Sequence, residues 1–240
     1  MKKPIIGIIS SREFNKNNYF RRIQKFPSQY SKMIIKAGGI PIGILLPNGY
    51  FYEDALKLCD GFVFQGGMNI FPEQLKCMHY IVKNKKPALG VCLGMQTIAG
   101  YCWLDNLLNG IKSYNDITKN YKKGITFLSK VNNHNKIDPF DNRRINDAKH
   151  DIILDKDSRL YNIFKKNCIS KVSVHNYKVQ DTVLNNSKLF KIVGRSLDNV
   201  IEAIESKDNN YFFIGVQFHP ELEEENIILF KELIKACKKP

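Results

Sequence analysis

The sequence lacks any apolar run long enough to cross a membrane, and this shortage argues against a transmembrane protein. Only six apolar or glycine residues separate Lys3 from Ser10, which is too few for a secretory leader. Six cysteines are present without the paired spacing of a disulfide framework. We therefore expect a cytoplasmic protein with reduced cysteines and no membrane partner.

Three other signals are missing from the chain. No His and Cys spacing is typical of a zinc site, and no glycine-rich loop ending in Lys-Ser or Lys-Thr indicates nucleotide binding. No nucleic-acid motif accompanies the net charge of +14, and the basic residues are scattered, often beside Asn. The charge therefore indicates a solvated, Lys-rich surface that could attract anionic substrates, and we expect no specific nucleic acid, metal or cofactor.

The 240 residues, 43% of them hydrophobic, are enough for one well-buried domain spanning 1–240. Compact apolar runs alternate with helical patterns over the first hundred residues, which predicts β-α-β units and a parallel sheet. Four later apolar runs are shorter and closer together, which predicts antiparallel additions: Ile152 to Leu154, Cys168 to Val174, Leu189 to Val193 and Val200 to Ile204. The sequence therefore indicates one α/β domain.

One cysteine has the surroundings of a nucleophile. Cys92 follows a short apolar run and precedes a helical pattern from Met95 to Leu104, so it falls where a strand turns sharply into a helix. Gly90 and Gly94 stand two residues before and after it, where neighbouring backbone must pass without Cβ clashes. The helix N-terminus and a nearby imidazolium would favour the thiolate.

A matching base lies near the other end of the chain. The β-branched and aromatic run from Tyr211 to Phe218 predicts a buried strand that delivers His219. Pro220 ends that strand, and the acidic residues from Glu221 to Glu225 are expected to open the last helix. A base with a carboxylate two positions later fits covalent catalysis, in which Glu221 holds the imidazole in one tautomer.

The remaining candidates have simpler explanations. A cysteine in a hydrophobic run is usually a small core residue, and a lone histidine is usually a surface or hydrogen-bonded core residue. We expect His79 and His134 to be of this second kind. We expect five cysteines to be of the first kind: Cys59, Cys77, Cys102, Cys168 and Cys237.

In these motifs the chain resembles the class I glutamine amidotransferase superfamily, with its Cys-His-Glu triad. The resemblance covers nearly the whole chain. The opening strands, first helix and glycine loop of one branch are similar to three segments of this sequence: Pro4 to Ser10, Tyr30 to Ile42 and Asp60 to Gly67. That branch is peptidase family C26, the free-standing γ-glutamyl hydrolases, which include γ-glutamyl-γ-aminobutyrate hydrolases. The resemblance implies a flavodoxin-like three-layer sandwich, mostly parallel and flanked by helices, with a small antiparallel addition.

The resemblance also implies roles for individual residues. Cys92 is the expected nucleophile, His219 the base and then acid, and Glu221 its partner. The expected oxyanion hole consists of the backbone N–H groups of Leu93 and Gly67. Residues expected to line the glutamyl pocket are Gly66, Gln96, Ser173, Val174 and His175.

Some residues depart from the hydrolase pattern. Leu93 stands where those hydrolases commonly have Arg, and Asn69 stands where their glycine loop has Asp. Both Leu93 and the segment from Val174 to Tyr177 look more like the glutaminase subunits of biosynthetic amidotransferases. The departures leave the triad intact and bear on which amine leaves.

Three functions follow from these features. The first is a stand-alone hydrolase of γ-glutamyl amide bonds, which forms a thioester on Cys92 and releases glutamate and an amine; no synthase-like region accompanies the motifs. The second is a glutaminase subunit that passes ammonia from glutamine to a partner synthase. The third is a noncatalytic binding protein on the same fold. A homo-oligomer is compatible with all three.

Two further segments could determine which substrate the protein accepts. The polar stretch from Asp105 to Lys149 is long for a structureless loop, so we expect it to be either a functional lid or binding loop or a locally disordered segment. Lys149 to Leu154, at its end, resembles a family strand that re-enters the fold beside the active site. In the first loop, Tyr19 to Arg22 could reach the same mouth.

Overall fold

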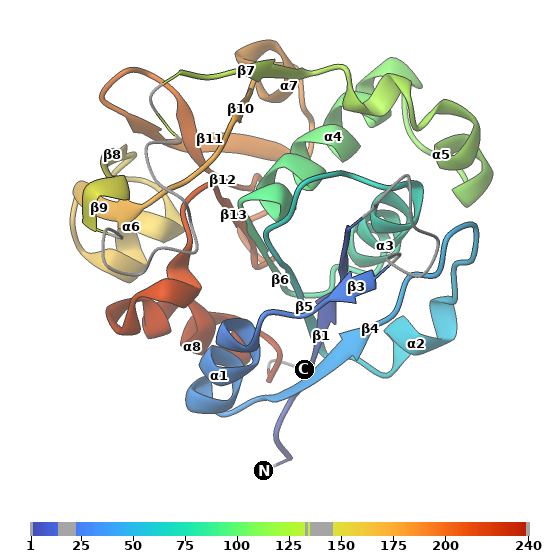
Figure 1. The fold of residues 1–240 in the computed structure, drawn as a ribbon, viewed down its shortest axis with the longest axis horizontal. Coiled ribbons are helices and arrows are strands. Elements are labelled where there is room, and N and C mark those ends of the chain that lie inside the picture. Colours follow the sequence, from blue (N-terminus) through green and yellow to red (C-terminus); the bar gives the residue numbers. More distant parts are fainter. Residues whose placement is uncertain (1, 14–22, 133, 135–145, 239–240) are drawn as a thin grey trace.

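A nine-stranded sheet runs through the centre of the protein (Figure 1). The structure is a computed structural model that describes residues 2–13, 23–132, 134 and 146–238. The order of the strands in the sheet is β4-β1-β5-β6-β13-β12-β11-β8-β9. Their bounds are β1 (Ile5–Ile9), β4 (Ile40–Ile44), β5 (Gly61–Phe64), β6 (Ala88–Val91), β8 (Lys149–Leu154), β9 (Cys168–Val172), β11 (Phe190–Ser196), β12 (Ile201–Ser206) and β13 (Phe213–Val216).

The direction of the strands divides this sheet in two. Strands β4, β1, β5, β6 and β13 are parallel to one another, whereas β12, β11, β8 and β9 pair antiparallel. The predicted α/β fold with antiparallel additions is confirmed, and the segment expected to re-enter the fold is β8. Two small antiparallel sheets accompany it, formed by β2 (Ser11–Glu13) with β3 (Ile23–Lys25) and by β7 (Leu128–Lys130) with β10 (Tyr177–Val179).

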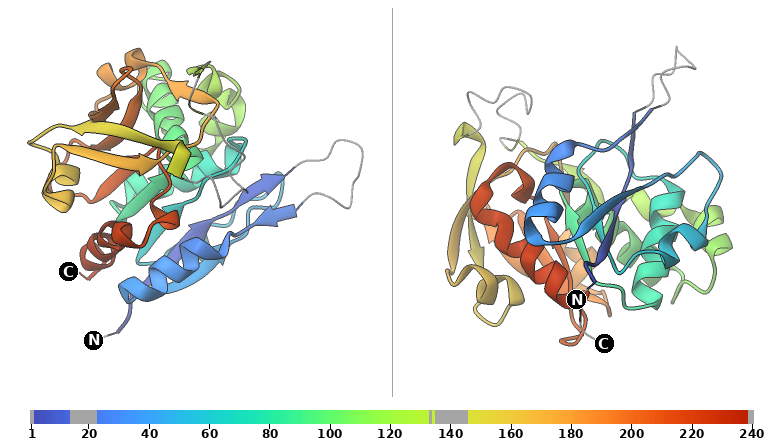
Figure 2. Two further views of the ribbon diagram at one scale, coloured as in Figure 1. Left: turned by 60° about the vertical axis from the view of Figure 1, so that its left-hand side comes forward. Right: turned by 90° about the horizontal axis from the view of Figure 1, so that it is seen from below.

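Helices cover both faces of the sheet (Figure 2). Helix α1 packs against α8 on one face, and α3 packs against α4 on the other. The α-helices are α1 (Ser28–Ala37), α2 (Glu53–Lys57), α3 (Pro72–Lys83), α4 (Leu93–Leu107), α5 (Tyr114–Asn120), α6 (Arg159–Phe164), α7 (Asp181–Asn185) and α8 (Ile227–Ala236). Short 3-10 turns are η2 (Lys123–Ile125), η4 (Pro220–Leu222) and η5 (Glu224–Asn226).

The central strands are buried on both faces, which explains their continuous apolar sequences. Because successive side chains of a strand point to opposite faces, Phe62 and Phe64 of β5 join the core beneath α3 and α4, while Val63 joins the core beneath α1 and α8. In β6, Ala88 joins the core beneath α3 and α4, and Leu89 joins the core beneath α1 and α8. This alternation produces two apolar cores and therefore the three-layer arrangement.

Two expectations about helices require correction. The last helix begins at Ile227 rather than near Glu221, because the residues after His219 first form η4 and η5. The region from Asp105 is also more ordered than expected, since α4 continues to Leu107 and α5 follows. A capping box between Ser113 and Asp116 starts α5 and was the available sequence signal.

The cysteine predictions hold in part. Cys59, Cys77 and Cys102 are buried, and Cys237 is half-buried. The prediction of a core position is wrong for Cys168, which is exposed. Cys168 begins β9 at the edge of the sheet, where alternate side chains point to solvent.

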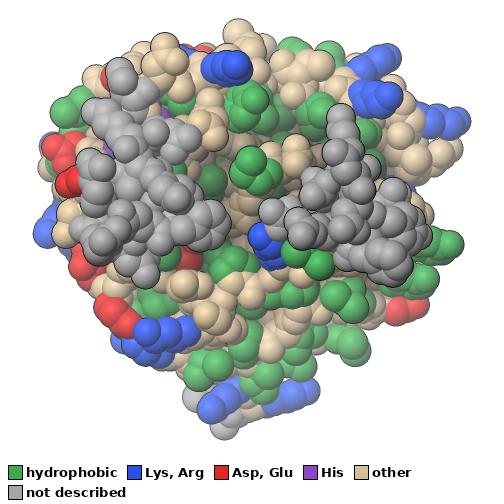
Figure 3. Space-filling model, in the orientation of Figure 1, with side chains coloured by type: hydrophobic (Ala, Val, Ile, Leu, Met, Phe, Trp, Pro, Cys, Tyr) green, Lys and Arg blue, Asp and Glu red, His purple; other side chains and the backbone are tan. Residues whose placement is uncertain are grey.

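Lys and Arg side chains are spread over the visible face of the protein. On the face drawn in Figure 3 they stand in several separate places, most of them near the rim, instead of gathering into one patch. None of the helices within the described residues is long and apolar enough to cross a membrane.

The turn from β6 into α4 depends on two glycines. A Cβ on Gly94 would lie 2.3 Å from the carbonyl oxygen of Phe64, and a Cβ on Gly90 would lie 2.9 Å from the carbonyl oxygen of Gly94. Backbone atoms cannot give way as a flexible side chain can, so larger residues would displace β5 or α4.

We expect Gly94→Ala to lower the free energy of unfolding by on the order of 3 kcal/mol, since the added methyl group meets backbone. Gly124→Ala is the matched control, because its Cβ would meet only Leu104 at 3.4 Å or beyond. Urea unfolding of both variants measures the difference, and equal losses would contradict this explanation of the turn.

Candidate active site

The candidate site lies beyond the carboxyl ends of three neighbouring parallel strands. The glycine loop follows β5, Cys92 follows β6, and His219 comes shortly after β13. Because parallel strands end at the same edge of a sheet, segments far apart in the chain meet there, as is usual for ligand sites of α/β proteins.

Cys92 occupies the predicted strand-to-helix turn in a strained conformation. Its φ of 51° is in the left-handed region that favours glycine, and its ψ is −106°. Its N–H donates to the carbonyl of Val216 at 2.8 Å, and its carbonyl accepts from the N–H of Gln96 at 3.1 Å. Cys92 is thus fixed by β13 on one side and by the first turn of α4 on the other. Such a conformation costs about 1–3 kcal/mol and is typical of functional sites.

His219 and Glu221 form a hydrogen-bonded pair beside this cysteine. Glu221 Oε1 lies 2.7 Å from His219 Nδ1, and the side chain of Glu221 is only 5% exposed. Cys92 is among the groups that raise the pKa of His219, so its sulfur lies close to the imidazole, and because Nδ1 is bonded to Glu221, Nε2 is the ring nitrogen left to interact with the thiol. Gly66 borders both residues, since a Cβ there would lie 3.1 Å from His219 Cε1 and 3.7 Å from Cys92 Cβ. The predicted Cys-His-Glu residues are therefore brought together.

The electrostatic surroundings favour a charged imidazole. Burial by itself lowers the pKa of His219, but the Glu221 carboxylate and Cys92 raise it, and the net result is a pKa well above its usual value. A protonated His219 stabilises a thiolate on Cys92 and can later donate its proton to a leaving group.

Tyr30 joins the glycine loop to the acidic end of the triad. Its hydroxyl accepts a hydrogen bond from the N–H of Gly66 at 2.9 Å. Burial and then the neighbouring Glu221 raise the pKa of Tyr30 well above its usual value, so its hydroxyl stays neutral. This role could not be found from the sequence, because Tyr30 sits in α1 and only the tertiary fold brings that helix to the loop.

The two glycines of the loop differ in their surroundings. The Gly66 N–H is occupied by Tyr30, whereas Gly67 is exposed. A Cβ on Gly67 would lie 2.9 Å from Leu93 Cδ2, so Gly67 and Leu93 are neighbours. Leu93 is the first residue of α4, where N–H groups have no partner within the helix.

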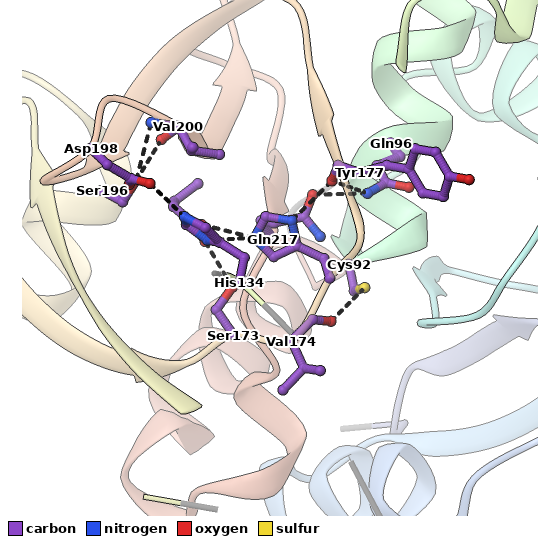
Figure 4. A network of polar contacts seen from close by, with 12 residues as sticks. Cys92, Gln96, His134, Ser173, Val174, Tyr177, Ser196, Asp198, Val200 and Gln217 are labelled. Carbon is purple, nitrogen blue, oxygen red and sulfur yellow. Dashed lines mark hydrogen bonds and ion pairs between the residues drawn. The ribbon is translucent and has the colours of Figure 1, made fainter. Parts of the chain in front are cut away.

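Gln96 supports the opposite wall of the site (Figure 4). Its Nε2 donates to the carbonyl of Tyr177 and to Gln217 Oε1, both at 3.1 Å. Gln96 is buried, so the side chain ties α4 to the start of β10. In the connection that leads from β9 to β10, the carbonyl of Val174 accepts from Cys92 Sγ at 3.9 Å.

The neighbouring residues of this connection bond elsewhere. Ser173 Oγ donates to Glu202 Oε2 at 3.0 Å, and His175 Nε2 lies 3.1 Å from Glu202 Oε1. Both side chains are buried in these contacts. Their predicted role in the glutamyl pocket stays a prediction, while Val174 presents its backbone carbonyl to Cys92.

Several residues of this network had no signal in the sequence. Glu202 lies in an apolar strand and Gln217 in an apolar run, where polar residues stand out only once the strands are assigned. His134, expected to be a surface or hydrogen-bonded core residue, is buried and contacts His175 and Asp198. The segment Tyr19 to Arg22, expected at the mouth, lies outside the described residues.

The chain belongs to the class-I glutamine amidotransferase family, whose sequence profile matches residues 26–236. It is 30% identical to a glutamine amidotransferase-like protein of Rickettsia prowazekii, with 99% of both chains covered. It is also 30% identical to the glutamine-hydrolyzing GMP synthase subunit of Sulfurisphaera tokodaii, with 89% of this chain and 96% of the relative covered.

A solved structure supports the fold. The glutaminase domain of Trypanosoma brucei CTPS, solved with bound acivicin, has a TM-score of 0.66 to this protein at 18% identity. The match covers 98% of this chain and 94% of that one.

The raised pKa of His219 can be tested through the reactivity of Cys92. We expect Glu221→Gln to lower the pKa of His219, because the favourable carboxylate charge is lost. With less positive charge on the imidazole beside Cys92, attack by its sulfur is less favoured, so the rate of Cys92 alkylation by iodoacetamide should fall at about pH 6–8. The rate is measured on the Cys92 peptide by mass spectrometry.

The Glu221→Gln variant and the chain with Glu221 unchanged both carry Cys168→Ser, because this substitution removes an exposed thiol that would also react with iodoacetamide. Identical pH profiles with and without Glu221→Gln would contradict the assigned partnership.

Proposed function

We propose that the protein is a glutaminase that hydrolyses the side-chain amide of glutamine and passes ammonia to a partner synthase. The Cys92-His219-Glu221 arrangement carries the proposal, because it unites a strained thiol, a base and an orienting carboxylate. The synthase partner is supported by the likeness to the GMP synthase subunit of Sulfurisphaera tokodaii, which extends over 96% of that relative.

The first half-reaction of the proposal begins at Cys92. The thiolate of Cys92 attacks the γ-carbonyl carbon of glutamine, and the carbonyl oxygen becomes an oxyanion. The N–H groups of Leu93 and Gly67 are proposed to bind that oxyanion. As the tetrahedral intermediate collapses, the C–N bond breaks and His219 donates its Nε2 proton to the amino group, which leaves as ammonia.

The second half-reaction returns the enzyme to its starting state. Neutral His219 takes a proton from water, whose oxygen attacks the γ-glutamyl thioester. The C–S bond breaks, glutamate leaves, and Cys92 returns as a thiolate beside protonated His219. Glu221 holds His219 in position through both steps by accepting from Nδ1–H.

A stand-alone γ-glutamyl hydrolase is the second candidate. It is compatible with the likeness to the Rickettsia relative, which covers 99% of both chains. The narrower assignment to peptidase family C26 rests on the opening strands and the glycine loop and stays a prediction.

The purified chain should release ammonia from glutamine, and mass spectrometry should trap one glutamyl group on Cys92. Cys92→Ala should abolish both results, while the control Cys168→Ala should preserve them, since Cys168 lies on the edge strand β9. Turnover by Cys92→Ala would contradict any reaction at this site. A complete absence of turnover, alone and with synthases, would favour a noncatalytic protein.

The two candidate enzymes differ in their leaving groups. A glutaminase should prefer glutamine to γ-glutamyl alkylamides and be stimulated by its synthase. Alkylamides hydrolysed at least about tenfold faster than glutamine, a difference of about 1.4 kcal/mol in the barrier, would establish the hydrolase instead.

We expect Tyr30→Phe to lower kcat/KM about tenfold, because the Gly66 N–H loses its acceptor and the glycine loop beside Cys92 shifts. Tyr50→Phe is the control, since Tyr50 is exposed. Steady-state assays of both variants measure the effect, and equal activity would contradict a positioning role for Tyr30.

A further inference from the structure

A second cluster of titratable side chains lies behind the connection between β9 and β10. His134, His150 and Glu202 each offer one ligand atom, and these atoms all lie within 4.8 Å of one another. His134 and Glu202 are buried, and His150 on β8 is half-buried. Three separate parts of the chain therefore converge, which the sequence does not indicate because these residues have no metal-ligand spacing.

The outer nitrogens of two histidines in this region are held by acceptors. His134 Nε2 lies 2.8 Å from Asp198 Oδ2, and His175 Nδ1 lies 2.9 Å from the carbonyl oxygen of Tyr177 (Figure 4). Since a carbonyl or carboxylate oxygen can only accept, each of these nitrogens carries the hydrogen. In neutral rings, the inner nitrogens of both histidines are then bare.

The bare nitrogens face each other and a carboxylate. His134 Nδ1 and His175 Nε2 are 3.1 Å apart, and Glu202 Oε1 lies 3.5 Å from the first and 3.1 Å from the second. Three acceptors at this separation repel unless a cation lies among them. Metal-binding histidines are typically held in this way, with the outer nitrogen bonded to a carboxylate or backbone carbonyl.

The distances among His134 Nδ1, His175 Nε2 and Glu202 Oε1 also suit a particular kind of metal ion. Ligand atoms about 2.0–2.1 Å from a tetrahedral zinc ion lie about 3.3–3.4 Å from one another. Imidazole and carboxylate ligands suit zinc and its neighbours among the divalent transition metals. His150 adds another imidazole, with its ring centre 4.3 Å from that of His134.

We propose that His134, His150 and Glu202, with His175 beside them, bind one divalent transition-metal ion of the zinc class. The site is distinct from the Cys92 thiol, and the proposal does not depend on the proposed glutaminase activity. It joins β8, β12 and the segment at His134 to the connection whose Val174 carbonyl contacts Cys92. Bound metal would therefore brace one wall of the candidate active site.

A proton is the competing occupant. A doubly protonated His134 could donate from Nδ1 to Glu202 or His175, and no metal would then be needed. The experiment must distinguish a bound metal ion from a proton. It must also exclude metal that is bound by the thiol of Cys92.

The full chain is dialysed against Zn²⁺ at about pH 7.5, bound metal is measured by mass spectrometry, and affinity is measured by calorimetry. We expect one tightly bound Zn²⁺ per chain, weakened at least about tenfold by His150→Gln. His150 is half-buried, and within the described part of the chain its side chain makes ring contacts with His134 and His175, so this variant should fold. His134→Gln and Glu202→Gln provide further tests.

Two control variants should retain the metal. His79→Gln alters a buried histidine on α3 that bonds Tyr101 outside the cluster, and Cys92→Ala removes the candidate nucleophile. The Co²⁺-loaded protein should show no thiolate-to-cobalt charge-transfer band. Absence of stoichiometric binding, affinity unchanged in His150→Gln, or affinity lost in Cys92→Ala would overturn the proposal.

Discussion

The parallel pairing of β6 with β13 is the constraint on which the site depends. Gly90 and Val91 lie opposite Gly215 and Val216 in register, and the N–H of Cys92 continues this ladder to the carbonyl of Val216. Residues more than a hundred positions apart thus end at one edge of the sheet. Slipping the register by one residue would turn alternate side chains to the other face and separate the thiol from the imidazole.

Near the pair formed by β6 and β13, polar side chains act mainly by forming hydrogen bonds with backbone groups of neighbouring segments. Tyr30 holds the glycine loop through the N–H of Gly66, and Gln96 holds the start of β10 through the carbonyl of Tyr177. Each is buried, so its hydrogen bonds face little competition from water. The reactive groups can therefore remain aligned although Cys92 is strained.

The parts of the fold that depend on local pattern could be predicted from the sequence. The elbow at Cys92 could be predicted because glycine spacing, a strand and a helix coincide there, and the strand before His219 has a clear apolar signature. The role of Tyr30 and the grouping of His134, His150 and Glu202 could not be predicted, because they depend on how distant elements pack. The exposed Cys168 was misassigned because an edge strand and a central strand look alike in sequence.

The most direct test of the account is the titration of His219, followed by side-chain nitrogen NMR in the wild type and in Cys92→Ala. The imidazole of the wild type should remain protonated well above its usual range, because both Glu221 and Cys92 raise the pKa of His219. Removal of the thiol should lower that pKa. The same pKa in both proteins would show that sulfur and imidazole do not interact, and the proposed chemistry would lose its basis.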